Sequence, residues 1–255
     1  MTGQHASTFS LRLRSAISVL ILLSAWEITA RLQLTPPLFL PPFSVVAVQL
    51  GRSIGDGTLV ADLALSLYRT FAGLALATAV GVFTGMLMSQ SRFVHWFVDP
   101  IVALAFPSPK IAFIPVFILW FGIESLSKIL LVAFACVFPV VIGTYSAARG
   151  VGRIFIWSAS SLGTSRTALL RRVILPACYP RIFATLRIAL PVALITTFTA
   201  EMVAGGGGMG ATLIYSQRFF DSPTVYAYIL VMLCVGLVLD AAMIKFQSRY
   251  LAWAE

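Results

Sequence analysis

The stretch LSKILLVAFACVFPVVIGTYSA, residues 126–147, decides the fold class of this chain. It is almost wholly apolar. At about 1.5 Å of rise per residue, a helix of this length crosses the roughly 30 Å hydrocarbon core of a bilayer. Similar stretches place the expected spans at about residues 16–34, 63–88, 98–121, 126–147, 182–204 and 224–244. The sequence therefore predicts an all-α polytopic membrane protein with about six transmembrane helices.

Composition supports lipid as the main solvent. Of the 255 residues, 59% are hydrophobic and 11% are charged, whereas soluble domains carry roughly 25% charged residues. The formal net charge is +9, but the basic residues lie mainly between apolar runs. Nucleic-acid binding needs a basic face on a soluble module, so we expect the lipid bilayer and no nucleic acid among the partners.

The distribution of basic residues orients the predicted spans. One side carries Arg12, Arg14, Arg92, Arg149, Arg153, Arg166, Arg171, Arg172, Arg181, Lys245 and Arg249, and the other carries Arg52, Lys128 and Arg218. Segments rich in Lys and Arg stay in the cytoplasm. Both termini and the basic segment of residues 148–181 are therefore expected in the cytoplasm.

Two regions are expected along the chain. Residues 1–62 would hold an N-terminal tail, the first transmembrane helix and a periplasmic loop, and residues 63–255 a core membrane domain that includes the 148–181 segment. Glu27 and Arg31 are spaced for an ion pair on one helix face. A basic start before a short apolar stretch also fits a signal peptide. Residues 35–62 are rich in proline and predict an external loop, with a short helix over residues 43–54.

The third expected span is interrupted by Pro107 and Pro109 on either side of Ser108. Such a break inside the membrane is tolerated only where protein or a water-filled cavity covers it. Lys110 follows the break, and Glu201 lies toward the end of the fifth span. One interpretation places Lys110, Glu201 and Ser108 along a translocation pathway, with Lys110 attracting an anionic solute. The structural alternative pairs Lys110 with Glu201 or with carbonyls freed by the prolines.

Other polar features receive structural interpretations. Arg69 and Arg187 lie near span ends, where their side chains can reach the interface. The run of residues 205–210 is glycine-rich but lacks the lysine of a P-loop, so we expect a flexible turn and no ATP site. The three cysteines and two histidines lack metal-ligand spacing, so no metal is expected.

The 148–181 segment holds the most informative motif. From Trp157 it reads WSASSLGTSRTALLRRVILP, ending at Pro176. This pattern predicts a short helix, a turn at Gly163, and a second amphipathic helix that the proline ends. Apolar residues among arginines suit docking on a protein surface or resting on anionic lipid headgroups, and the residues alone leave both open.

The motif resembles the cytoplasmic loop of permeases of ATP-binding cassette importers. Ala159, Leu162, Gly163 and Pro176 match that pattern, as does Thr164-Ser165-Arg166, whereas Trp157 and Ser158 stand where the family has Glu and Ala. Further stretches, at residues 40–44, 66–69, 107–115, 117–122, 127–130 and 200–202, resemble the nitrate, sulfonate, taurine and bicarbonate branch. The resemblance covers about residues 38–253.

This resemblance implies a permease subunit of the bacterial inner membrane. Its partners would be two cytoplasmic ATPase subunits, a periplasmic binding protein and a second permease copy. The ATPases would hold ATP and magnesium, so no cofactor is expected in this chain. A coupling helix between spans four and five would dock on the ATPase through Ala159, Leu162, Gly163, Thr164, Ser165, Arg166 and Pro176. The solute would be small, with an organic anion such as a sulfonate, or a nitrate-like ion, favoured.

Two other functions were weighed. An intramembrane hydrolase or transferase needs a nucleophile and a base within reach, but the spans offer only Glu27, Glu201 and Asp240 and no interior histidine. We therefore expect no catalytic residues. A proton-coupled secondary carrier is the runner-up, although no inverted repeat is evident.

Overall fold

A computed structural model describes residues 3–250, with side chains from residue 17 onward except those of Arg166 and Tyr250. The described residues form helices joined by turns, without a β-strand among them. The prediction of an all-helical chain is confirmed at this level. The chain divides into two compact units, Met1–Val60 with Leu213–Val231, and Ala61–Thr212 with Met232–Glu255.

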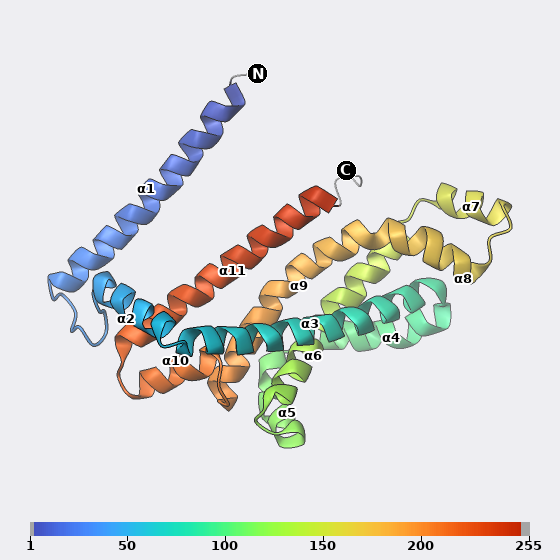
Figure 1. Cartoon of the computed structure of the whole chain (residues 1–255). Coiled ribbons are helices and arrows are strands. Elements are labelled where there is room, and N and C mark those ends of the chain that lie inside the picture. The colour runs from blue at the N-terminus through green and yellow to red at the C-terminus, as the bar shows by residue number, and fades with distance from the viewer. Residues whose placement is uncertain (1–2, 251–255) are drawn as a thin grey trace. The chain divides into compact units, whose positions relative to one another are not determined.

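The helices of the described residues follow one another with short connections (Figure 1). Their bounds are α1 Gly3–Arg31, α2 Phe43–Gly55, α3 Thr58–Gln90, α4 Arg92–Ala105, the 3₁₀ turn Lys110–Phe113, α5 Ile114–Phe121, α6 Ser125–Arg149, α7 Arg153–Ser161, α8 Arg166–Leu169, the π-helical turn Leu170–Ile174, α9 Leu175–Ala204, α10 Met209–Arg218 and α11 Ser222–Tyr250.

Four stretches of the described chain are long and apolar enough to cross a membrane. They are Thr58–Gln90, Ser125–Arg149, Thr167–Ala204 and Ser222–Arg249. A fifth span results if α4 and the Lys110–Phe121 pair count together, although these are bent by 93°. The first expected span, residues 16–34, overlaps α1, which ends at Arg31 and is not among these stretches, so six spans remain a prediction.

The smaller unit joins α1 to α2 through polar contacts. The expected ion pair is present, with Arg31 Nε 2.6 Å from Glu27 Oε1. The same carboxylate accepts hydrogen bonds from the backbone N–H and the hydroxyl of Ser44. Trp26 Nε1 donates to the carbonyl of Pro41 at 3.0 Å. The helix expected over residues 43–54 is observed as α2.

In the larger unit, α3 lies against α6 along a row of small residues. Gly73, Ala77, Gly81 and Gly85 recur every four positions, so they share one face of α3. A Cβ added at Gly73 would lie 2.6 Å from the Cβ of Val132 on α6, and one at Gly85 would lie 2.8 Å from the Cβ of Thr144. The two backbones therefore approach closely, as small residues permit in membrane helices.

Behind this contact, α6 and α9 form the core of the larger unit. Val132, Cys136 and Val140 on α6 and Ala189 and Ala193 on α9 are fully inaccessible to solvent. The backbone break between α4 and α5 is capped locally, because Ser108 Oγ donates to the carbonyl of Ala105 at 2.6 Å. The prolines thus end α4 without leaving that carbonyl unpaired.

The expected end of the second amphipathic helix at Pro176 is wrong. Pro176 does not end a helix, because the helical backbone runs on from Thr167 to Ala204. A π-helical turn at Leu170–Ile174 precedes the proline, and the Leu175 N–H bonds to the carbonyl of Leu170, five residues back. This wider turn changes the spacing of backbone partners just before the ring that would clash with an ordinary turn.

The close contact of α3 and α6 yields a stability prediction. Gly81→Ile should lower the free energy of unfolding by about 1–3 kcal/mol, because its Cβ would lie 2.7 Å from Val140 Cγ1. Thermal unfolding of the purified protein in detergent measures the effect. Gly236→Ile on α11 is the matched control, since a Cβ there meets nothing within 4 Å. Equal destabilisation of both variants would contradict the packing argument.

Candidate functional site

The turn after α7 is a defined helix cap. The N–H of Gly163 bonds to the carbonyl of Ser160 at 3.0 Å, and the N–H of Thr164 bonds to the carbonyl of Ala159 at 3.2 Å. This pair of bonds is the Schellman motif, which requires a left-handed residue, and Gly163 has φ +75°. The expected turn at Gly163 is confirmed, and its direction is fixed by the backbone.

This cap presents an apolar tip to solvent. Leu162 is 85% exposed, the highest value among the large hydrophobic residues of the described chain. Ser165 Oγ accepts a hydrogen bond from the N–H of Ala168 and so begins α8. The side chain of Arg166 lies outside what the structure describes. Ala159 through Ser165 thus form one ordered, outward-facing element.

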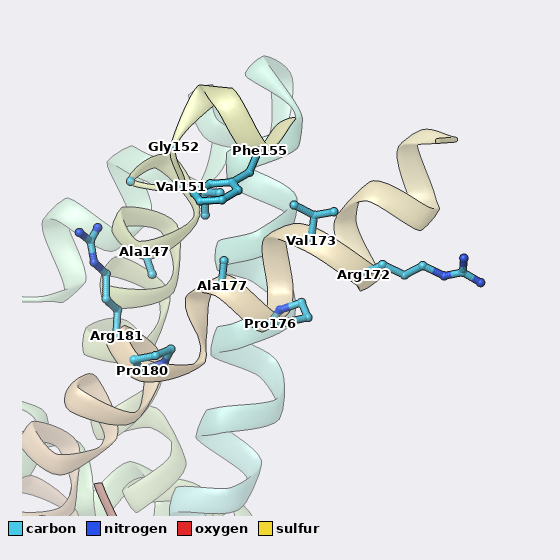
Figure 2. A pocket seen from close by; sticks show the side chains of 11 residues that line it. Ala147, Val151, Gly152, Phe155, Arg172, Val173, Pro176, Ala177, Pro180 and Arg181 are labelled. Carbon is cyan, nitrogen blue, oxygen red and sulfur yellow. The ribbon is translucent and has the colours of Figure 1, made fainter. Parts of the chain in front are cut away.

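A pocket of about 600 Å³ lies at the start of α7, the opposite end of this helix from the cap. Its lining comes from the end of α6, from Gly152 and Phe155 at the start of α7, and from Arg172 to Arg181 around the start of α9. Figure 2 shows Phe155, Val173 and Ala177 around the apolar centre, with Arg181 and Arg172 on opposite sides. Pro176, one of the expected coupling residues, belongs to this lining.

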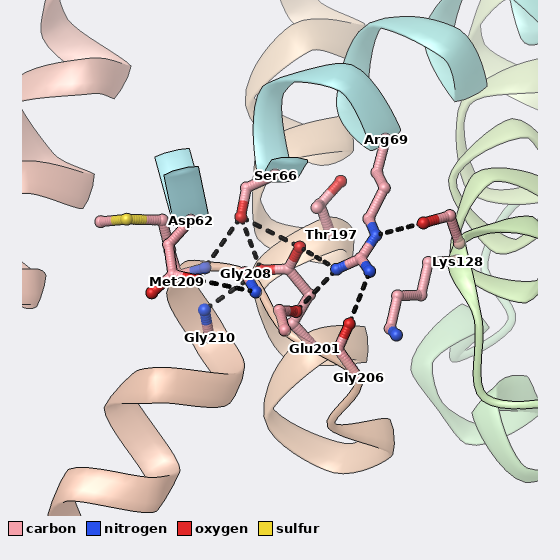
Figure 3. Close-up of polar contacts among 12 residues, drawn as sticks. Asp62, Ser66, Arg69, Lys128, Thr197, Glu201, Gly206, Gly208, Met209 and Gly210 are labelled. Carbon is pink, nitrogen blue, oxygen red and sulfur yellow. Dashed lines mark hydrogen bonds and ion pairs between the residues drawn. The ribbon is translucent and has the colours of Figure 1, made fainter. Parts of the chain in front are cut away.

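A second polar site lies within the core of the larger unit (Figure 3). Arg69 on α3 and Glu201 on α9 form an ion pair with 2.8 Å between Nη1 and Oε1. Their side chains are 1% and 0% exposed. Ser66 Oγ donates to the same carboxylate at 2.8 Å. An isolated charge at such a place is expensive, and a pair with further hydrogen bonds offsets that cost.

Backbone groups of the glycine-rich run form further hydrogen bonds to both members of the ion pair. Arg69 donates to the carbonyls of Gly206 and Gly207 at 2.8 and 2.7 Å, and Gly210 N–H donates to Glu201 Oε2 at 3.1 Å. Gly205 to Gly208 all have positive φ, which only glycine adopts without strain. A side chain at Gly208 would collide with the Glu201 carboxylate. The expected turn is present, and its backbone in addition fits around the ion pair and bonds to both partners.

Two lysines differ from their expected settings. Lys110 does not pair with Glu201, because that carboxylate is occupied by Arg69. Its Nζ instead donates to the carbonyl of Phe106, the second structural alternative, and lies 5.4 and 5.8 Å from the ring centroids of Phe106 and Phe138. Lys128, counted among the basic residues of the side opposite the cytoplasm, is 1% exposed and donates to the carbonyl of Ile123 at 2.7 Å.

The two arginines expected to reach the interface are both ion-paired. Arg69 is buried, so its expected position is wrong. Arg187 on α9 lies 2.9 Å from Asp240 on α11, and both side chains are about half-exposed. Among the described residues, no group of three or more His, Cys, Asp or Glu side chains is arranged to hold a metal ion.

The sequence predicts the turn at Gly163 but not the buried site formed by Arg69 and Glu201. The residues of that site are visible in the sequence as the Ser66–Arg69 stretch, Glu201 and the glycine run. Nothing in one chain's spacing shows that residues more than 130 positions apart meet. Asp62 was also missed, although its carboxylate accepts hydrogen bonds from Gly208 N–H and the Thr212 hydroxyl.

Residues 77–251 match the family described as the binding-protein-dependent transport system inner membrane component. The chain belongs to this family. The taurine transport system permease protein TauC of Escherichia coli K12 is 36% identical over 91% of this chain and 86% of its own length. The putative aliphatic sulfonates transport permease protein SsuC of Bacillus subtilis 168 is 29% identical over 91% and 84%.

Solved structures agree on the fold. The inward-facing MetNI methionine transporter aligns with a TM-score of 0.67 at 17% identity, over 74% of this chain and 94% of that chain. An amino acid transporter structure aligns with a TM-score of 0.62 at 16% identity. The chain is thus an integral membrane permease subunit of an ATP-binding cassette importer. It is non-catalytic, and ATP is hydrolysed by a separate chain. This family membership displaces the hydrolase and the proton-coupled carrier.

The buried ion pair yields a second stability prediction. Arg69→Met should lower the free energy of unfolding by about 3–5 kcal/mol, because Glu201 would remain buried without its partner. The matched control, Arg187→Met, breaks a half-exposed pair and should cost less. Thermal unfolding in the same detergent compares them. If Arg69→Met lowered the free energy of unfolding no more than Arg187→Met does, burial would not determine how much an ion pair contributes to stability.

Proposed function

We propose that this chain pairs with a second permease copy to form the pathway for a small organic anion, with a sulfonate favoured and a nitrate-like ion as the alternative. The printed names of the relatives, which concern taurine and aliphatic sulfonates, support the solute class. The proposed arrangement has six spans, with both termini in the cytoplasm of a bacterium and the chain in its inner membrane. Residues 1–62 form the N-terminal part and residues 63–255 the permease core.

The partners follow from the same proposal. Two cytoplasmic ATPase subunits, which hold ATP and magnesium, drive transport, and a periplasmic binding protein delivers the solute. This chain itself holds no cofactor. ATP-driven closure of the ATPases favours one permease state over the other, and that difference in affinity supplies the conformational shift.

One observation carries the coupling role, namely the exposed apolar tip at Leu162 on a rigid cap. A leucine that is 85% exposed gains from being covered by a partner. The cap holds it in place through the backbone bonds of Gly163 and Thr164, so a push on the tip reaches α8 and α9. We assign Ala159 to Arg166 to ATPase docking and Pro176 to the joint between the docking element and α9.

The pathway residues divide into two roles. Lys110 sits at the break between α4 and α5, partly accessible and bonded only to a carbonyl and two ring faces, so it remains able to meet an anion. The Ser108 hydroxyl donates to the carbonyl of Ala105 and so stabilises the backbone at the same break. Glu201 is wholly buried and bonded to Arg69, so we assign it a supporting role beside the pathway.

Coupling is tested by adding a charge at the tip. Leu162→Glu should reduce the amount of ATPase that co-purifies with the tagged chain by about tenfold, because a buried carboxylate without a partner costs well over 1.4 kcal/mol. Mass spectrometry of the purified complex gives the ratio. Thr167→Glu is the matched control, since Thr167 is exposed on α8 outside the docking element. Normal ATPase recovery with Leu162→Glu would overturn the docking role.

The pathway cation is tested by uptake of taurine into cells. Lys110→Met should lower the uptake rate by about tenfold, while Lys110→Arg keeps most of it, because an anion loses one charge-assisted contact only in the first variant. ATPase co-purification serves as the control and should be unchanged in both. Equal uptake by Lys110→Met and the unmodified chain would remove Lys110 from the pathway.

A further inference from the structure

The pocket at the start of α7 has features that the coupling role does not use. Arg172 and Arg181 line it, and neither guanidinium has a hydrogen bond or ion pair within the described chain. Residues 148–181 contain six arginines, namely Arg149, Arg153, Arg166, Arg171, Arg172 and Arg181, and no Asp or Glu. The pocket therefore offers positive charge with no internal counter-charge.

The rest of the lining is apolar, and the pocket is large enough for part of a lipid. Phe155, Val173, Pro176 and Ala177 form the wall between the two arginines, and the volume is about 600 Å³ (Figure 2). A soluble inorganic ion would gain no binding energy from the apolar wall. A molecule with a phosphate at one end and a hydrocarbon body at the other satisfies both parts of the lining.

Depth places the pocket at the level of headgroups, given the topology proposed above. Along α9, Arg181 lies about 35 Å from Ala204 at the opposite end, at roughly 1.5 Å per residue. The hydrocarbon core is about 30 Å thick, and the bilayer with headgroups is about 40–45 Å thick. Arg181 therefore falls within the cytoplasmic headgroup layer, where anionic phospholipids meet basic protein segments.

We propose that this pocket binds the headgroup of an anionic phospholipid. The phosphate contacts Arg181, the glycerol and upper acyl chains cover Phe155 and the adjoining apolar wall, and Arg172 adds positive charge at the far side of that wall. The bound lipid would hold the start of α7 against α9 and so set the position of the Leu162 tip. The proposal rests on the proposed function for its topology, but lipid binding is measured on the permease without the ATPase.

The test measures phosphatidylglycerol binding to the purified full-length chain in neutral detergent by native mass spectrometry. The unmodified chain should bind phosphatidylglycerol more tightly than phosphatidylcholine with the same acyl chains. The double variant Arg172→Gln/Arg181→Gln should weaken phosphatidylglycerol binding about tenfold, since each arginine near an anionic lipid contributes about 1 kcal/mol. Arg171→Gln, the neighbouring arginine outside the lining, should change it by less than about twofold.

A second variant tests the pocket without removing charge. Ala177→Trp fills the space beneath Phe155 and should also weaken phosphatidylglycerol binding, with every arginine in place. Thermal unfolding confirms that each variant is folded. Four results would overturn the proposal. Arg171→Gln could weaken phosphatidylglycerol binding as much as the double variant does, Ala177→Trp could leave that binding unchanged, or millimolar inorganic phosphate could displace the lipid. In the fourth, Arg172→Gln/Arg181→Gln binds the lipid normally but loses the ATPase, which would assign the pocket to the protein partner.

The proposed importer role is judged separately. A chain that docks the ATPase normally but does not bind the lipid would contradict the lipid proposal and leave the importer role intact.

Discussion

The buried ion pair of Arg69 and Glu201 constrains the larger unit, because several elements must be placed so that they bond to it. Two charges removed from water are tolerated only when their remaining donors and acceptors are also satisfied. Here the hydrogen bonds come from Ser66 on α3, from Ser125 at the start of α6, and from three backbone groups of the glycine run. The pair thus ties together elements that lie far apart in the chain.

The same requirement explains the composition of the glycine run. Carbonyls can point at Arg69 and an N–H at Glu201 only if the backbone turns through left-handed conformations, and a side chain at Gly208 would occupy the place of the carboxylate. Further along the same face of α3, the small residues from Gly73 to Gly85 let α6 come near. Polar satisfaction and tight packing therefore meet on one helix.

Much of this could be predicted from the sequence because it depends on local pattern. Long apolar runs gave the helices, Gly163 gave the turn, and Glu27 with Arg31 gave an ion pair one helical turn apart. Contacts between distant segments could not be predicted in this way, so the partner of Lys110 stayed open between Glu201 and a nearby carbonyl, and Arg69 was placed at the interface. The end of the docking helix was misplaced for a different reason, since a π-helical turn overrides the usual effect of Pro176.

That π-helical turn has a mechanical consequence. Because the helical backbone is continuous from Thr167 to Ala204, no loop separates the element beside the tip from the expected fifth span. A continuous helix transmits a displacement that a loop would absorb. The additional residue in the turn also rotates everything that follows by about 100° relative to a regular helix. The face that α9 presents to α6 therefore depends on the five residues of this turn, of which Ile174 is itself buried against Cys178 and Ile182.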